Sequence, residues 1–216
     1  FCLMQELKVI KILQEELKFT DQSIDKLKML EYELLKANKK HNFIAKSTEG
    51  LIWSRHILDS AQLVKYINFK QGSLSDLGSG AGFPGLVLAI ISREKYPSLQ
   101  ITLVEADKRK AVFLKEIVRT QGLNSVVIPE RIEKVPILDA DIVTARALAS
   151  LNVLLGYAYN HIKNDGRCIF FKGISYNKEV EEALDYWNFN IKVDASITNP
   201  GSAILKIKDL EEKNGT

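Results

Sequence analysis

The first third of the chain carries apolar residues three or four positions apart, which is the spacing of one face of an α-helix. Residues 4–38 show this spacing in two runs, and Thr20 stands before the second run, where a hydroxyl side chain suits a helix start. A further apolar run from Leu51 to Ile67 predicts another helix, after a break at residues 41–45. We therefore expect residues 1–72 to form a helical extension that packs on the rest of the chain.

After Gly72 the pattern changes to short apolar runs that alternate with helical ones. The short runs predict strands at residues 74–77, 101–104, 126–128, 141–144, 167–172, 191–193 and 203–207. The segments between them predict helices at residues 84–91, 108–121, 148–162 and 179–186. This alternation is typical of an α/β fold with a Rossmann-like, mostly parallel, doubly wound sheet. The last two strands have no helix between them and predict an antiparallel edge hairpin, so we expect a domain over residues 73–210 and a polar tail at 211–216.

The composition of the 216-residue chain is that of an ordinary globular protein, with 46% hydrophobic and 26% charged residues. The sequence has no apolar run near the roughly 20 residues that span a membrane, and residues 1–6 do not resemble a secretory signal, so a cytoplasmic protein is expected. Two cysteines and three histidines are too few for a zinc cluster, so no metal is expected, and Cys168 is predicted to be a buried reduced thiol. The net charge of +3 falls within residues 1–72, which indicates either solvated helix surfaces or a surface for a polyanion.

A glycine-rich segment follows the first predicted strand, with the sequence Asp76-Leu77-Gly78-Ser79-Gly80-Ala81-Gly82-Phe83-Pro84-Gly85. In a parallel α/β sheet, the loop between the first strand and its helix lies at the ligand-binding edge. Residues 80–85 match the G-x-G-x-x-G pattern of dinucleotide sites, and Glu105 stands where an acid would bind ribose hydroxyls. An NAD(P)-dependent oxidoreductase is therefore one interpretation of this loop.

The carboxylate of Asp76 favours a different ligand. A pyrophosphate binds to the positive end of a helix and to backbone N–H groups, and a nearby carboxylate would repel it. S-adenosylmethionine carries a sulfonium and an ammonium group and no phosphate, so its charge suits an acid placed before Gly78 and Gly80. Glu105 can accept hydrogen bonds from ribose hydroxyls under either interpretation. The pattern therefore favours a methyltransferase that uses S-adenosylmethionine, and the oxidoreductase remains the alternative.

The end of the fourth predicted strand narrows the choice of methyl acceptor. Methylation of the adenine amino group commonly uses a D/N-P-P-aromatic motif, whereas residues 144–148 here read Thr-Ala-Arg-Ala-Leu. Methylation at cytosine C5 requires a nucleophilic cysteine in a strand-end loop, and Cys168 lies inside a strand. The sequence is therefore consistent with an acceptor atom that has an available lone pair, because its methylation needs no covalent step and no strong base.

Four segments together resemble the RsmG (GidB) family. They are the glycine loop at residues 76–85, Arg-His-Ile-Leu-Asp-Ser at 55–60, Ala-Arg-Ala-Leu-Ala-Ser-Leu at 145–151, and Lys-Gly at 172–173. The resemblance covers about residues 25–210. It implies transfer of a methyl group from S-adenosylmethionine to N7 of one guanine in 16S ribosomal RNA, free or in a small ribosomal subunit precursor. A non-catalytic RNA-binding protein of the same fold is a further alternative, and a monomer is expected because no segment looks like a dedicated dimer interface.

The resemblance also implies roles for single residues. Gly78, Gly80 and Phe83 would contact the cofactor, with Asp76 and Glu105 as its acidic partners. Ile132 and Glu133 would flank the adenine. Arg146 would organise the end of the cofactor and is the one candidate for a catalytic role, since guanine N7 carries no proton and needs no obligatory general base. Candidates for RNA contact are Asn42, Arg55, His56 and Lys172.

Some of these roles have alternatives. His56 precedes an apolar pair and is typical of a packing or capping residue, while Arg146 could form a surface salt bridge. Ile132 is bulky where relatives often have alanine or valine, which predicts a reshaped adenine pocket. The last strand lacks the basic residues that many relatives have before its apolar core, and this leaves Lys206 and Lys208 to contact RNA at that edge.

Overall fold

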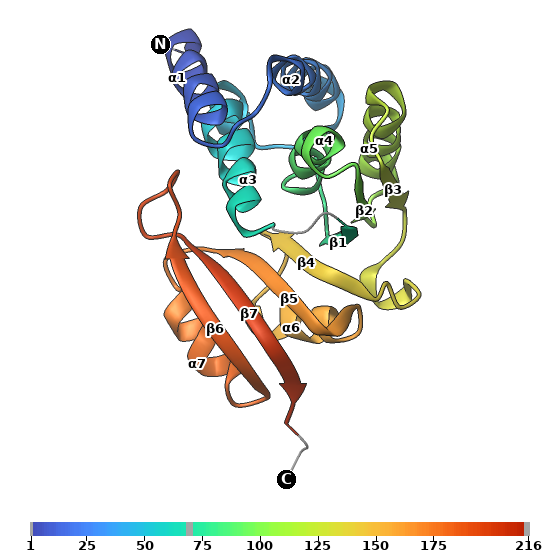
Figure 1. Cartoon of the computed structure of the whole chain (residues 1–216), viewed down its shortest axis with the longest axis vertical. Coiled ribbons are helices and arrows are strands. Elements are labelled where there is room, and N and C mark those ends of the chain that lie inside the picture. Colours follow the sequence, from blue (N-terminus) through green and yellow to red (C-terminus); the bar gives the residue numbers. More distant parts are fainter. Residues whose placement is uncertain (1, 68–70, 214–216) are drawn as a thin grey trace.

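The computed structural model describes residues 2–67 and 71–213, which form a seven-stranded sheet in the order β3-β2-β1-β4-β5-β7-β6 (Figure 1). The strands are β1 (Gln71–Leu77), β2 (Ser98–Val104), β3 (Ser125–Ile128), β4 (Ala140–Arg146), β5 (Ile162–Lys172), β6 (Trp187–Ala195) and β7 (Ala203–Glu212). Strands β1 to β5 pair in parallel, whereas β7 is antiparallel to both β5 and β6. These pairings confirm the predicted Rossmann-like sheet with its antiparallel edge hairpin.

Helices cover both faces of this sheet, each with its own apolar cluster. The first cluster joins the sheet to α1 (Cys2–Glu15), α2 (Asp21–His41), α4 (Gly85–Lys95) and α5 (Lys108–Gln121), and the second joins it to α6 (Leu151–Tyr159) and α7 (Tyr176–Ala183). Side chains alternate between the faces along a strand, so Ile142 of β4 belongs to the first cluster and Val143 to the second. The predicted helix at 148–162 is too long, because residues 148–150 precede α6 and Ile162 begins β5.

The N-terminal segment shares the first apolar cluster with the α/β domain. Leu27 of α2 and Leu88 of α4 are both fully buried members of it. At the other end, β7 continues to Glu212, two residues into the predicted polar tail, and residues 214–216 lie outside the described residues. The boundaries of the expected helical extension, domain and tail therefore stay a prediction, with β7 reaching beyond the expected domain end.

The segment predicted as a helix from Leu51 to Ile67 is helical up to Tyr66, but its turns are of mixed type. The chain forms a 3₁₀-helix at Lys46–Leu51, a π-helix at Ile52–Leu58, a single α-turn at Asp59–Ala61 and a second 3₁₀-helix at Gln62–Tyr66. Apolar residues of this segment point inward, as the sequence pattern indicated.

Three further expectations concern the Cys168 thiol, membrane-spanning helices and metal ligands. Cys168 is a free, fully buried thiol, as predicted, and burial raises its pKa. Over residues 2–67 and 71–213, no helix is both long and apolar enough to cross a membrane. In the same part of the chain, no group of three or more His, Cys, Asp or Glu side chains is placed to hold a metal ion.

Candidate active site

Three glycines shape the loop that follows β1. Gly78, Gly80 and Gly82 have φ angles of +68°, +59° and +99°, in the left-handed region that other residues rarely adopt. A Cβ atom on Gly78 would also lie 2.5 Å from Cδ1 of Leu148. The turn is fastened to the sheet where the Ser79 N–H donates to the Val104 carbonyl at 2.9 Å. The backbone conformation therefore favours glycine at position 78, and any side chain there would also have to displace that of Leu148.

Asp76 lies beneath this loop. Its side chain is fully buried, with Oδ1 accepting a hydrogen bond from the Thr144 hydroxyl at 2.9 Å and Oδ2 accepting one from the Gly85 N–H at 3.1 Å. Gly85 is the first residue of α4, and a Cβ atom there would lie 2.6 Å from Asp76 Oδ2. Burial raises the pKa of Asp76 to about 6. The carboxylate thus ties β1 to the start of α4. The sequence, in contrast, predicted that Asp76 contacts the cofactor.

Glu105 follows β2 and binds the glycine loop directly. Its Oε2 accepts a hydrogen bond from the Gly80 N–H at 2.6 Å, and its Oε1 accepts one from the Asp107 N–H at 2.7 Å. Each carboxylate oxygen can accept a further hydrogen bond. Glu105 therefore fixes the loop and still has capacity to accept hydrogen bonds from ribose hydroxyls.

A cleft of about 700 Å³ opens at the carboxyl ends of β1, β2 and β4. It brings together seven of the eight predicted cofactor residues, which are Gly78, Gly80, Phe83, Glu105, Ile132, Glu133 and Arg146, and it leaves out Asp76. The loop after α2 adds a wall that the sequence did not predict, formed by Phe43, Ile44 and Ala45. A cleft with mostly apolar walls and a few charged groups is the usual form of a cofactor site.

The two residues expected beside the adenine lie on one wall of this cleft. Ile132 is buried, and its carbonyl oxygen lies 3.1 Å from Nε2 of His161. Glu133 is exposed and accepts a hydrogen bond from the Tyr157 hydroxyl at 3.0 Å. Hydrogen bonds from its own backbone N–H and from Tyr157 hold the pKa of Glu133 below its ordinary value, so its carboxylate is ionised.

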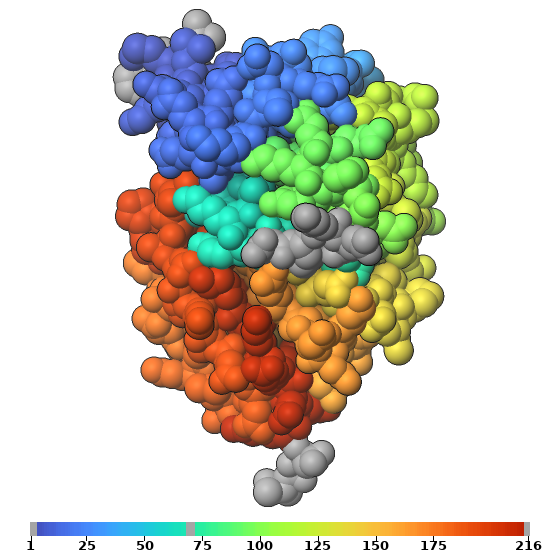
Figure 2. All heavy atoms as spheres, viewed as in Figure 1, coloured from blue at the N-terminus to red at the C-terminus, as the bar shows by residue number. Residues whose placement is uncertain are grey.

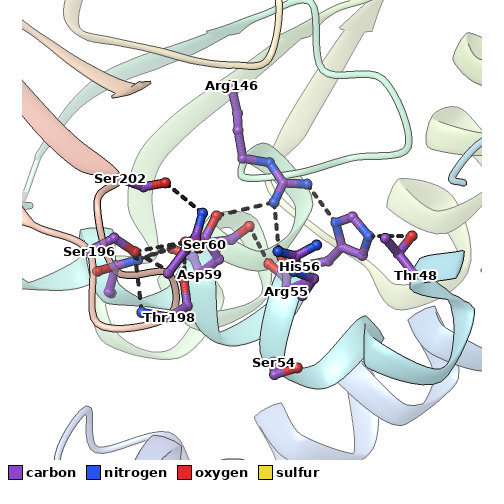
Figure 3. Close-up of polar contacts among 12 residues, drawn as sticks. Thr48, Ser54, Arg55, His56, Asp59, Ser60, Arg146, Ser196, Thr198 and Ser202 are labelled. Carbon is purple, nitrogen blue, oxygen red and sulfur yellow. Dashed lines mark hydrogen bonds and ion pairs between the residues drawn. The ribbon is translucent and has the colours of Figure 1, made fainter. Parts of the chain in front are cut away.

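Arg146 at the end of β4 reaches across to the N-terminal segment (Figure 3). Its Nη1 donates to the Arg55 carbonyl at 2.9 Å and lies 3.2 Å from Oδ2 of Asp59, while its Nη2 lies 2.8 Å from Nδ1 of His56. The side chain is only 16% exposed. Arg146 is therefore held in a fixed orientation inside the site, and the alternative of a surface salt bridge is wrong.

The contact with Arg146 determines the protonation of His56. A guanidinium can only donate, so Nδ1 of His56 accepts, and a neutral ring then carries its proton on Nε2. That Nε2 lies 3.2 Å from Oγ1 of Thr48, whose hydroxyl donates to the Ala45 carbonyl at 2.8 Å. Burial and the positive charges of Arg146 and Arg55 lower the pKa of His56 to about 4. His56 is thus a neutral link between Arg146 and the loop that walls the cleft.

Phe83 forms the apolar floor under this link. The ring of His56 is stacked on that of Phe83, with centroids 5.0 Å apart and planes at 25°. The guanidinium carbon of Arg146 lies 5.3 Å from the centroid of the same ring. The packing role that the sequence offered for His56 is confirmed, and it is combined with a polar role.

The irregular helix at residues 52–58 carries two of the partners of Arg146. The Arg55 carbonyl accepts from Arg146, and the His56 carbonyl accepts from the Asp59 N–H and from the Ser60 hydroxyl, the latter at 2.6 Å. Turns of π-helix often mark functional sites, and here His56 and the following Asp59 both contact Arg146.

A second cleft, of about 340 Å³, adjoins the first. Both are lined by Thr48, His56, Arg146 and Ala147. The far wall of the second cleft comes from Thr198, Asn199 and Ser202, in the loop between β6 and β7. Asp59 holds this loop in place, because its Oδ1 accepts from the Thr198 hydroxyl at 2.5 Å. Asp59 belongs to the motif at residues 55–60, whereas no sequence pattern predicted that this loop joins the site.

The predicted RNA contacts lie in different places. Arg55 is exposed and lines the second cleft. Asn42 is exposed at the end of α2 with a left-handed φ of +49°; it lines neither cleft itself but directly precedes Phe43 in the wall of the first. Lys172 also lines the second cleft, but its side chain is only 7% exposed and its Nζ lies 2.5 Å from Oε2 of Glu179. The structure thus places Lys172 in a buried ion pair, where the sequence predicted an RNA contact.

Comparison with known proteins identifies the family. The model of the family described as rRNA small subunit methyltransferase G matches residues 23–206. A ribosomal RNA small subunit methyltransferase G from Cereibacter sphaeroides is 43% identical over 194 residues, which cover 90% of this chain and 93% of that protein. One of the same name from Rickettsia prowazekii is 39% identical and covers 90% of this chain and 98% of its own length.

Solved structures agree in fold at low sequence identity. TYW2 from M. jannaschii in complex with AdoMet has a TM-score of 0.56 at 17% identity, covering 75% of this chain and 78% of that one. A SAM dependent methyltransferase from Aquifex aeolicus has a TM-score of 0.56 at 16% identity, covering 81% and 97%. These matches confirm the Rossmann-like methyltransferase fold. Because the family model spans most of the chain and the relatives are about 40% identical over nearly all of it, the chain belongs to the rRNA small subunit methyltransferase G family.

Proposed function

We propose that this protein transfers a methyl group from S-adenosylmethionine to N7 of one guanine in 16S ribosomal RNA. The observation that carries the proposal is the meeting of two clefts at Arg146, one suited to a cofactor and one to an acceptor base. Family membership gives the coarser reaction, methylation of small-subunit ribosomal RNA. The choice of guanine N7 is supported by the chemistry of the residues around Arg146.

The first cleft fits a cationic methyl donor. When bound, S-adenosylmethionine supplies an activated methyl group on a sulfonium centre. Gly78 and Gly80 bring backbone close to the cleft, and Glu105 offers carboxylate oxygens at its mouth. Ile132 and Glu133 would hold the adenine side. Asp76 acts through the loop that it ties to α4, as a positioning residue.

The second cleft would receive the guanine. Arg146 presents its guanidinium to both clefts, and three partners from residues 55–59 hold it still. Guanine N7 has a free lone pair and no proton to lose, so alignment of the two reactants supplies much of the catalysis. His56 is unsuited to act as a base, because its Nδ1 already accepts from Arg146. Arg55 and Asn42 remain proposed RNA contacts, while Lys172, which is paired with Glu179, lines the wall of the cleft.

The test is to map 7-methylguanine in small-subunit RNA after incubation with the protein and labelled S-adenosylmethionine. We expect one modified guanine, detected by chain cleavage at 7-methylguanine. Methyl transfer to another atom or to large-subunit RNA would contradict the proposal. Absence of transfer with intact RNA binding would favour the non-catalytic alternative, and tight NADH binding without S-adenosylmethionine binding would favour the oxidoreductase.

A substitution in the glycine loop tests the site. Gly78→Arg should abolish binding of S-adenosylmethionine, because Gly78 has φ +68° and a Cβ there would lie 2.5 Å from Leu148. Gly50→Ala is the matched control, since a Cβ at Gly50 meets no atom within 4 Å. Calorimetric titration measures both. If Gly78→Arg folds and binds the cofactor normally, the site has been assigned to the wrong loop.

A further inference from the structure

A basic groove of about 660 Å³ lies on the sheet away from both clefts. Five cationic side chains line it, contributed by the 3₁₀-helix at Gln62–Tyr66 and by strands β5, β6 and β7, and they are Lys65, Arg167, Lys192, Lys206 and Lys208. The strand register brings them together, since Arg167 is the partner of Lys208 and Lys206 is the partner of Lys192. We call this feature the sheet groove.

The sheet groove occupies a face that the helices leave open. Ile169 and Ile204 of β5 and β7 belong to the first apolar cluster, and Lys206 points to the same face as Ile204 because side chains alternate. In Figure 1, α6 and α7 lie behind strands β5, β7 and β6. Figure 2, in the same view, shows the orange and red atoms of these strands at the surface. The cationic side chains therefore face solvent where the first apolar cluster ends.

The described residues that line the sheet groove include no acidic side chain. Beside the groove, Asp194 attracts both Lys206 and Lys192, and Nζ of Lys206 lies 2.6 Å from its Oδ2 and 4.6 Å from the centroid of the Tyr66 ring. Within residues 2–67 and 71–213, Lys65, Lys192 and Lys208 have no carboxylate within 4 Å. Several cations gathered on adjacent strands, with one carboxylate beside them, are an electrostatic footprint for a polyanion.

Strand β5 runs from the sheet groove to the proposed acceptor cleft. It carries Arg167 in the groove and Phe171 in the wall of the acceptor cleft, four residues further on and on the same face of the sheet. At about 3.3 Å per residue, the two positions are roughly 13 Å apart. An RNA chain with one base in the acceptor cleft could therefore reach the groove with its neighbouring nucleotides.

We infer that the sheet groove binds the phosphate backbone of the ribosomal RNA substrate, outside the catalytic clefts and without reading its sequence. The inference rests on the proposed function for the nature of the polyanion. Phosphates of an RNA strand suit cations spread over three strands and a flanking helix. The bound segment would hold the RNA while its target base enters the acceptor cleft.

The test compares two triple variants with equal loss of charge. The groove variant is Lys65→Gln, Lys192→Gln and Lys208→Gln. The control variant is Lys28→Gln, Lys115→Gln and Lys178→Gln, which are exposed residues on helices α2, α5 and α7. Binding of a 16S ribosomal RNA transcript is measured from 50 to 300 mM salt, and binding of S-adenosylmethionine checks that each variant is folded.

For the groove variant we expect about tenfold weaker RNA binding at 100 mM salt, and a slope of log K against log salt that is smaller by about 2. The KM for RNA should rise while kcat at saturating RNA is kept. Equal binding by the two variants, or stronger competition by poly-L-glutamate than by RNA of the same charge, would overturn the inference. A wild-type protein that binds RNA but methylates none contradicts the proposed function alone, since the binding comparison still decides the groove.

Discussion

His56 connects the two clefts because its ring accepts a hydrogen bond on one side and donates on the other. Nδ1 accepts from Arg146, and Nε2 faces the hydroxyl of Thr48. Protonation would place a hydrogen on Nδ1 against a guanidinium, so that a hydrogen bond would be lost and two like charges would meet. The orientation of Arg146 therefore depends on a neutral imidazole.

This dependence predicts a pH effect on stability. The pKa of His56 is lowered to about 4 in the folded protein, below the unfolded value near 6.5, so the unfolded state binds more protons between these limits. The free energy of unfolding should fall as the pH drops from 6.5 to 4, with a contribution from His56 of up to about 1.4 kcal/mol per pH unit. His56→Gln should remove that contribution. Urea unfolding from pH 4.5 to 7.5 measures the difference from wild type.

The control for this experiment is His41→Gln, which changes an exposed histidine at the end of α2 and should keep the wild-type slope. Asp76, whose pKa is raised to about 6, contributes with the opposite sign, since its stabilising effect is lost as the pH rises from about 4 to 6. That contribution is present in all three proteins and cancels in the comparison. Parallel curves for wild type and His56→Gln would show that His56 titrates normally.

The glycine loop and helix α4 form one element fixed by Asp76. The carboxylate fits only because Gly85 lacks a side chain, since a Cβ there would lie 2.2 Å from Cδ2 of Leu103 and 2.6 Å from Oδ2 of Asp76. Such contacts leave no room for adjustment at the start of α4. The loop conformation and the first turn of α4 are therefore coupled.

Two glycine-to-alanine substitutions distinguish the coupling at Gly85 from the general effect of alanine on helix stability. Gly85→Ala should lower the free energy of unfolding by about 1–3 kcal/mol through overpacking and weaken binding of S-adenosylmethionine. Gly156→Ala in α6 should raise it by about 0.5–1 kcal/mol, because a Cβ there meets only Trp187, at 3.7 Å, and alanine is the better helix former. Denaturant unfolding and cofactor titration measure both. A neutral Gly85→Ala with normal cofactor binding would contradict the coupling.

The sequence predicted those parts of the site that depend on local chemistry. Gly78, Gly80, Glu105 and Arg146 all line the first cleft, because they lie at or just after the carboxyl ends of strands that meet at one edge of the sheet. The depth of Asp76 could not be predicted, since it depends on packing of β1 against α4. The burial of Lys172 likewise requires Glu179, which comes from a helix that begins only after the strand ends.

The helix type at residues 46–66 could not be predicted from the sequence pattern. Apolar spacing predicts a helix there, and Ile57 and Leu63 are fully buried, but the spacing does not distinguish 3₁₀- and π-turns from α-turns. Contacts between distant segments were equally hidden. Arg146 donates to the Arg55 carbonyl about ninety residues away along the chain, and the loop with Thr198 joins the site through Asp59. Local periodicity carries no signal for contacts of this range.

The sheet joins two apolar clusters, each with one tryptophan. Trp53 lies in the cluster that includes the N-terminal helices, and Trp187 lies in the cluster beneath α6 and α7. All strands from β1 to β7 are paired in one sheet, so loss of packing on one face should propagate to the other. We therefore expect the chain to unfold as one cooperative unit, including the predicted helical extension.

Single-tryptophan variants test this expectation. Trp187→Phe leaves Trp53 as the probe of the first cluster, and Trp53→Phe leaves Trp187 as the probe of the second. Leu27→Ala, which removes a fully buried side chain in α2, should cost about 2–5 kcal/mol and lower the urea midpoint equally for both probes. Met29→Ala on the exposed face of α2 is the control and should leave both midpoints nearly unchanged. If Leu27→Ala lowered only the urea midpoint reported by Trp53, the N-terminal helices would unfold as a separate unit. Residues 55–59, which hold Arg146, would then belong to a segment that unfolds before the sheet.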